Sequence, residues 1–161
     1  ITQQKVTGLR MPRMRAVLMQ DLLAAGYQYD SSINPTWLPG RYNNFHLPRT
    51  AYNDQGVKRI PASVSPGIRI PLFWLSFKNM PYTLYLQLCK QTLAKDGYLC
   101  LYFHPWEFTD LRDFNRFGFP GYVSKNSGVQ MYERLDNLII WMKKKNYHFH
   151  STRDLIDKIK S

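Results

Sequence analysis

Cysteine is scarce in this chain of 161 residues, which contains only Cys89 and Cys100. Two cysteines at this spacing form neither a zinc-ligand pattern nor the disulfide framework of a small secreted domain. Both lie in apolar segments, so we expect them to be small buried hydrophobic residues. Acidic residues are also few, since 11 Asp and Glu stand against 22 Lys and Arg and give a net charge of +11.

Other absences exclude whole classes of protein. No apolar run is long enough to cross a bilayer, and the first residues show no secretory signal. A phosphate-binding glycine loop, a Walker motif and a nucleophile elbow are all missing. The positive charge attracts polyanions in general, but it is dispersed, and its one dense run (143–145) falls at the end of a predicted helix. Nucleic acid is therefore the weakest hypothesis for a partner.

The residues that are present predict one α/β unit over 1–161. Hydrophobic residues make up 44% of the chain and aromatic residues 15%, enough for one core. Hydrophobic spacing predicts strands at 5–10, 27–29, 57–63, 98–103 and 147–150, and helices at 13–25, 81–96, 129–145 and 151–160. We expect 68–77 to be extended, and 33–53 and 105–128 to be long loops. Because 98–103 is almost continuously apolar, the pattern indicates a parallel sheet, either doubly wound or closed into a barrel.

Polar side chains that suit catalysis follow the ends of these strands. Arg10 ends the first strand, Asp30 the second, and His104 the strand at 98–103. The carboxyl ends of parallel strands meet at one edge of a sheet, where ligands collect. An arginine, a carboxylate and an imidazole there fit hydrolysis or group transfer, because the imidazole moves a proton near neutral pH. The alternative is that these residues only end buried strands in solvent.

Other side chains give weaker signals. His148 and His150 alternate along a predicted strand and share a face, but no third metal ligand stands nearby, so a polar strand edge is favoured. His46 lies in the aromatic loop, where it either touches a ligand or caps a turn. Trp37 and Trp106 stand beside the loops at the expected mouth, where they either stack on sugar rings or cover the core.

Four segments carry a resemblance to a known family. They are GLRMP (8–12), AAGYQYDSSINP (24–35), KRIPASVSPGIRIPLFW (58–74) and LYFHPWEF (101–108). In order and spacing they are similar to the later signatures of the polysaccharide deacetylases, the NodB-like carbohydrate esterases. The likeness extends over nearly the whole chain, and the motifs are specific only in combination.

The resemblance implies a distorted (β/α) barrel with about seven strands. It also implies a metal-dependent hydrolase that removes acetyl groups from an N-acetylated polysaccharide, with zinc or a similar divalent ion as cofactor. In the family the metal ligands and the base aspartate lie in two earlier signatures that this chain does not contain. We therefore expect no metal ligands here. The chain resembles the carboxyl-terminal half to two-thirds of the domain, and we expect a separate amino-terminal segment to be its partner.

The resemblance also assigns roles to the residues at the strand ends. Arg10 would pair with the base aspartate of the absent segment and keep it ionised. His104 would be the general acid that protonates the departing amine. Asp30 is a looser match, because the Asp-Trp pair of the family's fourth signature would fall near 33–34 and is missing. It would either orient His104 or only order its own loop.

Substrate binding is expected around these residues. Trp106 and Leu101 would form the wall of the pocket for the acetyl methyl group, and Trp37 and Arg69 are further candidates for contact with the glycan. A different class of function stays open, in which the chain is a non-catalytic carbohydrate-binding remnant of the same fold. The presence or absence of the two metal signatures upstream distinguishes these hypotheses.

Overall fold

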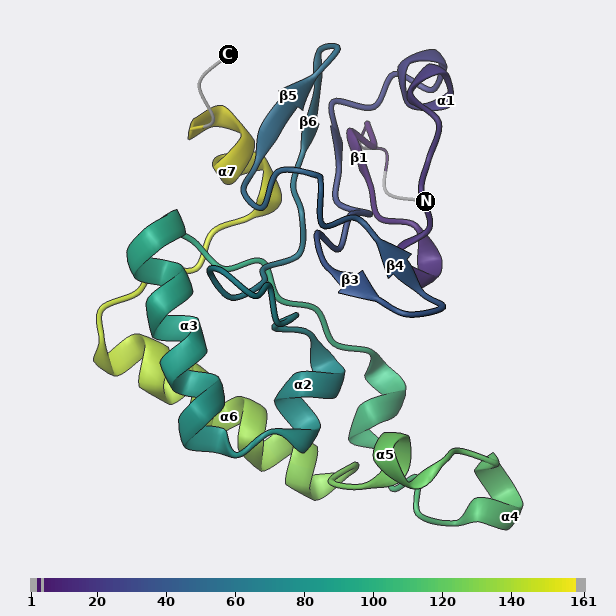
Figure 1. The fold of residues 1–161 in the computed structure, drawn as a ribbon, viewed down its shortest axis with the longest axis vertical. Helices are drawn as coiled ribbons and strands as arrows, with labels where there is room; N and C mark the ends of the chain where they lie inside the picture. Colours follow the sequence, from purple (N-terminus) through teal and green to yellow (C-terminus); the bar gives the residue numbers. More distant parts are fainter. Residues whose placement is uncertain (1–2, 4, 159–161) are drawn as a thin grey trace.

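The computed structural model describes residue 3 and residues 5–158. The strands are β1 (Gly8–Leu9), β2 (Tyr29–Asp30), β3 (Trp37–Leu38), β4 (Tyr42–Asn43), β5 (Tyr52–Asp54) and β6 (Val57–Arg59). The α-helices are α1 (Met19–Ala24), α2 (Trp74–Asn79), α3 (Tyr82–Asp96), α4 (Phe114–Phe117), α5 (Gly121–Ser124), α6 (Val129–Lys144) and α7 (Thr152–Lys158), with 3₁₀ helices η1 (Pro12–Met14) and η2 (Pro105–Phe108). This mixed α/β fold, with a small mixed sheet, confirms the predicted class (Figure 1).

The main sheet has the strand order β1-β2-β6-β5. Strands β1, β2 and β6 are parallel, and β5 pairs antiparallel with β6. Gly8 is paired with Tyr29, and a Cβ atom at Gly8 would lie 1.8 Å from Cζ of the Tyr29 ring, so the register requires glycine there. The prediction of parallel pairing is correct for β1, β2 and β6, although each strand is shorter than predicted.

The segment 98–103 lies beside the main sheet without forming a regular strand of it. The N–H of Ser63 donates to the carbonyl of Cys100 at 2.9 Å, while the N–H of Cys100 donates to the Ser63 hydroxyl at 2.8 Å. The hydroxyl of Ser63 thus takes the place of a backbone carbonyl as the hydrogen-bond acceptor, so the regular backbone ladder of the sheet does not continue into this segment. The predicted strand at 147–150 is likewise absent from the sheets of the described chain.

The two long predicted helices are confirmed as α3 and α6. Gly97 ends α3 in the left-handed conformation at φ 77°, and its N–H donates to the carbonyl of Leu93. Ser151 caps α7. Its hydroxyl and its N–H both donate to the carboxylate of Asp154, and the N–H of Asp154 donates to the Ser151 hydroxyl oxygen. The last residues of that predicted helix (159–161) lie outside the described residues.

Two predictions about local structure are wrong. The segment 68–77 is not wholly extended, since α2 begins at Trp74; an apolar run without periodicity does not separate a buried helix from a strand. The helix predicted at 13–25 is also shorter. Arg13 and Met14 have positive φ values of 59° and 51°, which interrupt the helical path, so α1 begins only at Met19.

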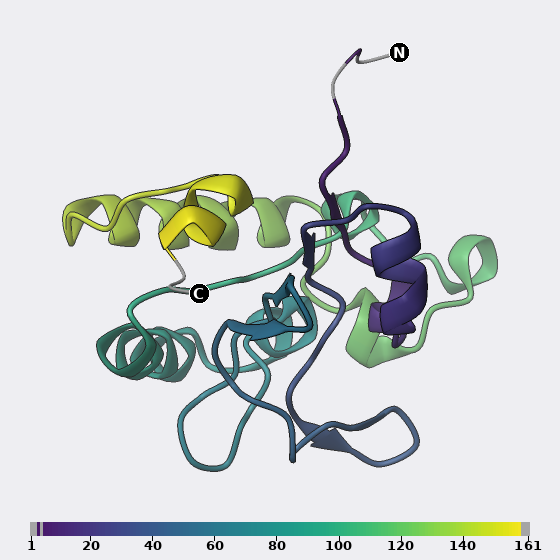
Figure 2. The same cartoon turned by 90° about the horizontal axis from the view of Figure 1, so that it is seen from above.

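The largest core cluster lies among α2, α3 and α6. Its buried members are Leu72, Phe77, Tyr85, Cys89, Met131, Leu138 and Met142. Seen from above, α6 and α7 lie on one side of the molecule and α3 lies on the other (Figure 2). Both cysteines are free thiols; Cys89 is fully buried as predicted, whereas Cys100 is only partly buried and contacts the guanidinium of Arg10.

The predicted long loop at 33–53 contains the β3–β4 hairpin and reaches β5. Arg49 ties it to the end of α3 through two contacts of 2.6 Å with the carboxylate of Asp96. Tyr42 packs into a small core cluster, whereas Trp37 is 60% exposed. The loop is therefore ordered, but only part of its aromatic content packs it.

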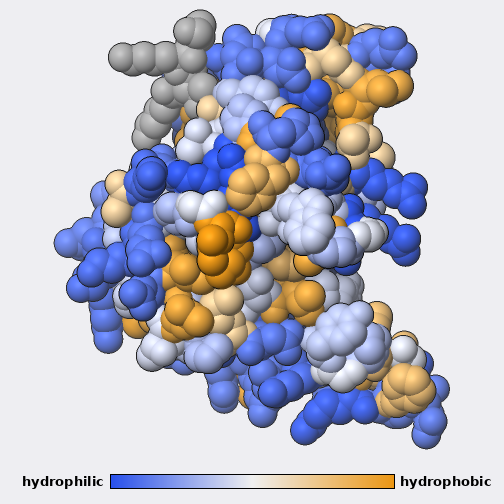
Figure 3. Space-filling model, viewed as in Figure 1, coloured by the Kyte–Doolittle hydropathy of each residue, from blue (hydrophilic) through white to orange (hydrophobic). Residues whose placement is uncertain are grey.

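Hydrophobic side chains also reach the surface. Figure 3 shows them over the middle of one face, with hydrophilic regions above and below. Among the described residues, no helix has the length and apolar character that a bilayer crossing needs.

Candidate functional site

His104 is held by a carboxylate that follows it closely in the chain. Pro105 begins η2, and this turn brings Glu107 back toward His104. Oε1 of Glu107 lies 2.6 Å from Nδ1 of His104 and accepts the backbone N–H of His104 at 3.2 Å. Glu107 is fully buried, whereas the His104 side chain is 37% exposed. The imidazole therefore has one nitrogen anchored in the protein and an edge open to solvent.

Aromatic rings surround the imidazole. Trp106 stacks on His104 with ring centres 5.2 Å apart, and Phe119 stacks on the other side of Trp106 at 5.4 Å. Trp74 and Tyr102 meet the His104 ring edge-on, at 5.6 Å and 5.9 Å. Within the described chain, no hydrogen bond is made to Nε2 of His104. The ring is thus fixed in orientation while Nε2 stays available.

A buried lysine lies behind this aromatic cluster. Lys78 is fully buried on α2, and its ammonium group donates to the carbonyl of Val123 at 2.7 Å. It also lies 5.7 Å from the centre of the Trp74 ring and 5.9 Å from that of Trp106. Burial lowers the pKa of Lys78, and the charge of Glu107 opposes this shift. The two buried residues of opposite charge therefore act on each other electrostatically.

Arg10 reaches the same cluster from the end of β1. Its guanidinium donates to the hydroxyl of Ser31 at 2.7 Å and contacts the Cys100 sulfur at 3.2 Å. The guanidinium carbon lies 5.3 Å from the centre of the Tyr102 ring, and that ring also contacts His104 and Phe73, each at 5.9 Å between ring centres. Arg10 and His104, which sequence analysis assigned to one mouth of the sheet, thus contact the same side chain.

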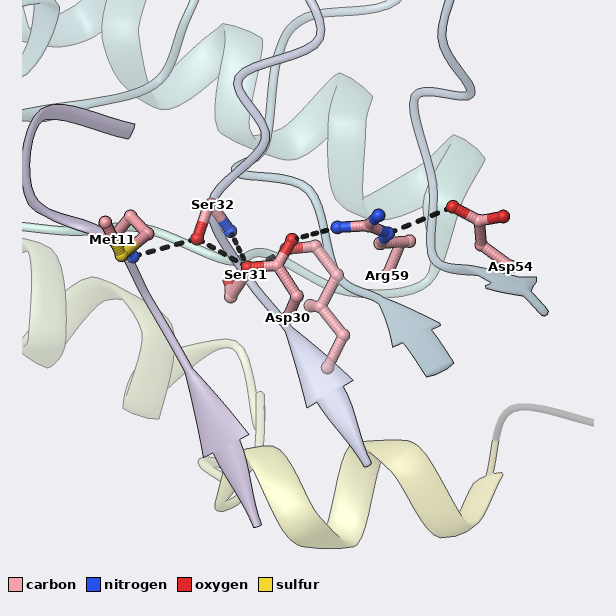
Figure 4. Close-up of polar contacts among 7 residues, drawn as sticks. Met11, Asp30, Ser31, Ser32, Asp54 and Arg59 are labelled. Atoms are coloured by element: carbon pink, nitrogen blue, oxygen red, sulfur yellow. Dashed lines mark hydrogen bonds and ion pairs between the residues drawn. The ribbon is translucent and has the colours of Figure 1, made fainter. Parts of the chain in front are cut away.

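Asp30 belongs to a separate buried network, which Figure 4 shows as a row of polar contacts. Its Oδ2 lies 2.6 Å from Nη1 of Arg59, whose Nε contacts Asp54 at 3.1 Å. The hydroxyl and the N–H of Ser32 both donate to Oδ1 of Asp30, and the Ser32 hydroxyl accepts the N–H of Met11 at 2.8 Å. These contacts tie β1, β2 and β6 together.

This network decides between the two roles expected for Asp30. Burial disfavours the charge of Arg59, but the hydrogen bonds and charges of Asp30 and, to a smaller extent, Asp54 together outweigh burial and raise the pKa of Arg59. Asp30 is fully buried and makes no contact with His104. The carboxylate that orients His104 is that of Glu107, so Asp30 orders the strand ends instead.

A groove with a volume of about 610 Å³ lies between the segment 98–103, α6 and the segment 147–155. Leu101 and Arg10 both line it, and the other lining side chains are mostly apolar. His104 and Trp106 do not line it. We expected Leu101 and Trp106 to form one pocket wall, but only Leu101 lines this groove. Arg10 lines the groove together with Leu101.

Trp37 and Arg69, the other expected substrate contacts, lie apart from His104 in the loop region. Trp37 is exposed on β3. The guanidinium of Arg69 donates to the carbonyls of Leu47 at 2.8 Å and Pro35 at 3.2 Å, and its carbon lies 4.6 Å from the centre of the Phe45 ring. Arg69 thus holds the loop through Nη1, which donates both of these hydrogen bonds.

The remaining histidines give no metal site. His148 and His150 are exposed, with ring centres 6.3 Å apart. His46 is exposed in the loop. In the part of the chain that the structure describes, no three His, Cys, Asp or Glu side chains group together in a way that would hold a metal.

No protein-family model matches this chain, and neither a curated protein nor a solved structure matches it. The likeness to the deacetylases therefore rests on the sequence motifs alone, and the chemistry of the site on the contacts described above.

Sequence reasoning missed three residues around His104, namely Trp74, Lys78 and Glu107. Glu107 carried a signal, since a proline directly after His104 and an acid three positions on are typical of a capped turn. Trp74 and Lys78 carried none, because Trp74 lies in the segment 68–77 that we expected to be extended and Lys78 directly follows it, so helix α2 was not predicted.

Proposed function

We propose that this chain is the carboxyl-terminal part of a polysaccharide deacetylase domain, which hydrolyses N-acetyl groups on a glycan with the help of a divalent metal. The observation that carries the proposal is the contact of both Arg10 and His104 with the ring of Tyr102. These are the two residues to which the deacetylase motifs give catalytic roles. Their proximity supports a common task.

The geometry of His104 suits a general acid. Hydrolysis of an acetamide breaks the bond between the carbonyl carbon and nitrogen, adds the oxygen of water to that carbon, and needs a proton on the departing nitrogen. Nδ1 of His104 is engaged with Glu107, and the side chain is 37% exposed, so Nε2 is the atom that would deliver this proton. An imidazole carries such a proton near neutral pH.

Arg10 is well placed to form an ion pair with a carboxylate from another segment. Its guanidinium is anchored by Ser31 and Tyr102, yet it faces the large groove. A base aspartate contributed by another segment would be kept ionised beside this cation. A zinc or similar ion would supply the activated water, and its ligands would come from the same segment, because the described residues hold no suitable group.

The groove supports the proposal that a further segment completes a distorted barrel of about seven strands. Its lining is mostly apolar, and within the described chain the peptide groups of Leu99 and Leu101 make no backbone hydrogen bonds. Open peptide groups beside an apolar groove suit an added strand. The net charge of +11 favours an acidic one.

The aromatic cluster supports a sugar substrate. Trp106 is partly exposed and is held between His104 and Phe119. Because these two rings cover the faces of the indole, its partly exposed edge is the apolar surface that would meet the CH groups of an N-acetylated sugar, beside the atom that would protonate the sugar nitrogen. We therefore propose that Trp106, rather than Trp37 or Arg69, contacts the substrate.

The test is acetate release from N-acetylglucosamine oligomers by the complete gene product with zinc. We expect His104→Gln to lower kcat by about 10²- to 10⁴-fold, the usual contribution of a general acid. His46→Gln, at an exposed histidine in the loop 33–53 and outside the lining of the groove, is the matched control and should retain activity. Equal activity in both variants contradicts the proposal, and so does oligomer binding without acetate release, which would identify a carbohydrate-binding module.

A further inference from the structure

We infer that Glu107 is a positioning residue that keeps a proton on Nδ1 of His104, and that the buried Lys78 balances the charge of Glu107. The chemical use of this arrangement rests on the proposed function. The arrangement itself rests only on the contacts of the described residues, so the two are testable separately.

The first step is the hydrogen-bond geometry. Oε1 of Glu107 receives the backbone N–H of His104 at 3.2 Å and lies 2.6 Å from Nδ1. An oxygen that already accepts a backbone N–H within a carboxylate acts as acceptor toward the ring as well, so the proton of that contact belongs to Nδ1. Nε2 is then the nitrogen that gains and loses a proton, as a donor to substrate requires.

The second step is the charge of Glu107. Glu107 is fully buried, and its Oε2 has no hydrogen-bond partner in the described part of the chain. A carboxylate in such surroundings tends to take up a proton unless a positive charge lies near. Lys78, also fully buried, is close enough for the charge of Glu107 to act on it. The lysine thus favours the ionised carboxylate that His104 needs.

The third step is the separation of Lys78 from the imidazole. The ammonium group lies near the rings of Trp74 and Trp106, and both rings contact His104. Lys78 therefore lies behind the aromatic cluster, where its repulsion of a charged imidazole is smaller than the attraction of the directly bonded Glu107. The other cation near the ring is Arg10, on the far side of Tyr102.

A purely structural role for Glu107 makes a different prediction. If Glu107 only caps the turn η2, then Glu107→Gln keeps the function, because the amide oxygen still accepts from both nitrogens of His104. If the negative charge of Glu107 matters, the same substitution weakens the electrostatic attraction that stabilises a protonated His104 imidazole. Lys78→Met, which removes the positive charge and keeps most of the length of the side chain, acts in the same direction, because the buried carboxylate then loses the cation that favours its ionised form.

The experiment is an NMR titration of the ring nitrogens of His104 in the 161-residue chain, in the native protein and in both variants. We expect the midpoint to fall in both variants, because Glu107→Gln removes the negative charge beside the ring and Lys78→Met removes the cation that favours the ionised carboxylate. A midpoint in Glu107→Gln that matches the native one overturns the inference. The native protein alone gives a second test, since long-range nitrogen–proton correlations should show the proton on Nδ1 in the neutral ring; a proton on Nε2 with a bare Nδ1 refutes the inference even if a variant fails to fold.

The complete gene product separates this inference from the proposed function. Glu107→Gln should lower kcat for N-acetylglucosamine oligomers with little change in KM, and the alkaline fall in activity should begin at lower pH. If the native protein releases no acetate while the titrations behave as expected, the proposed function is wrong and the role of Glu107 stands. If acetate is released and Glu107→Gln changes neither kcat nor its pH dependence, the role of Glu107 is wrong.

Discussion

The guanidinium carbon of Arg10 lies 5.3 Å from the centre of the Tyr102 ring. Tyr102 also contacts the imidazole of His104, at 5.9 Å between ring centres. Burial raises the pKa of Tyr102 well above its ordinary value, so the phenol stays neutral and the ring acts through its aromatic face and edge. One neutral ring thus fixes the spacing of the two proposed catalytic side chains.

This role predicts a difference between two substitutions of Tyr102. Tyr102→Phe keeps the ring and should retain acetate release by the complete gene product. Tyr102→Leu removes the ring face under Arg10, a contact worth about 0.5 to 2 kcal/mol, and should lower kcat. The comparison is valid for variants with similar thermal midpoints, and equal kcat in the two would show that the ring does not position Arg10.

The buried pair of Asp30 and Arg59 predicts a large effect on stability. Asp30→Ala leaves the Arg59 charge with only the partly exposed Asp54 as partner, and breaking a buried pair costs about 3 kcal/mol or more. The free energy of unfolding in urea measures this loss. Asp110→Ala removes the carboxylate of an exposed pair with Arg112 and should leave the stability unchanged. Comparable losses in both variants would contradict the structural role of Asp30.

Tyr98 predicts how stability changes at alkaline pH. Its hydroxyl accepts the N–H of Ala51 at 2.7 Å, and burial raises the pKa of Tyr98 from 10.0 to about 12. Because the folded value exceeds the unfolded one, the stabilisation is complete below pH 10 and is lost as pH rises toward 12.

The matched variants are Tyr98→Phe and Tyr132→Phe, the latter at an exposed tyrosine. We expect the native protein to lose on the order of 2 kcal/mol more than Tyr98→Phe between pH 9 and pH 12. Tyr132→Phe should follow the native curve. Urea unfolding across this range provides the measurement, and parallel curves for all three proteins would rule out a shifted Tyr98.

The contacts of Arg69 predict local loosening of the loop. Arg69→Met removes two donors to the carbonyls of Pro35 and Leu47, which we expect to cost about 2 kcal/mol. Amide hydrogen exchange should accelerate in the loop 33–53 and stay unchanged in α3. Arg15→Met, at an exposed arginine, is the control. Unchanged exchange near Leu47 would show that Arg69 does not hold the loop and would restore it as a candidate substrate contact.

Much of the site follows from the sequence because of one topological rule. Parallel strands bring their carboxyl ends to one edge, and this rule predicted that Arg10 and His104 lie near each other, although the segment before His104 is not a strand of the sheet. The same rule placed Asp30 correctly at a strand end but left its role open. The strand order determines which residue a carboxylate at the end of a strand contacts. Asp30 meets Arg59 because β2 pairs with β6, and the spacing of residues in the sequence does not predict this pairing.

The fold around His104 was harder to predict for a physical reason. Helix α2 lies in an apolar run, where burial on all sides removes the periodicity that distinguishes helix from strand. Sequence analysis therefore did not identify Trp74 and Lys78 as residues of the site. The segments 98–103 and 147–150 have strand-forming composition, but a strand is defined by its partners, and within the described chain neither has a continuous ladder.

The most direct test of the account is a double-substitution cycle of Arg10→Lys and His104→Gln in the zinc-loaded complete gene product, with acetate release from N-acetylglucosamine oligomers as readout. The account predicts that each single variant folds and loses most of kcat, and that the double variant is little slower than the worse single one, because both residues serve the same reaction. Native rates in either single variant would contradict it.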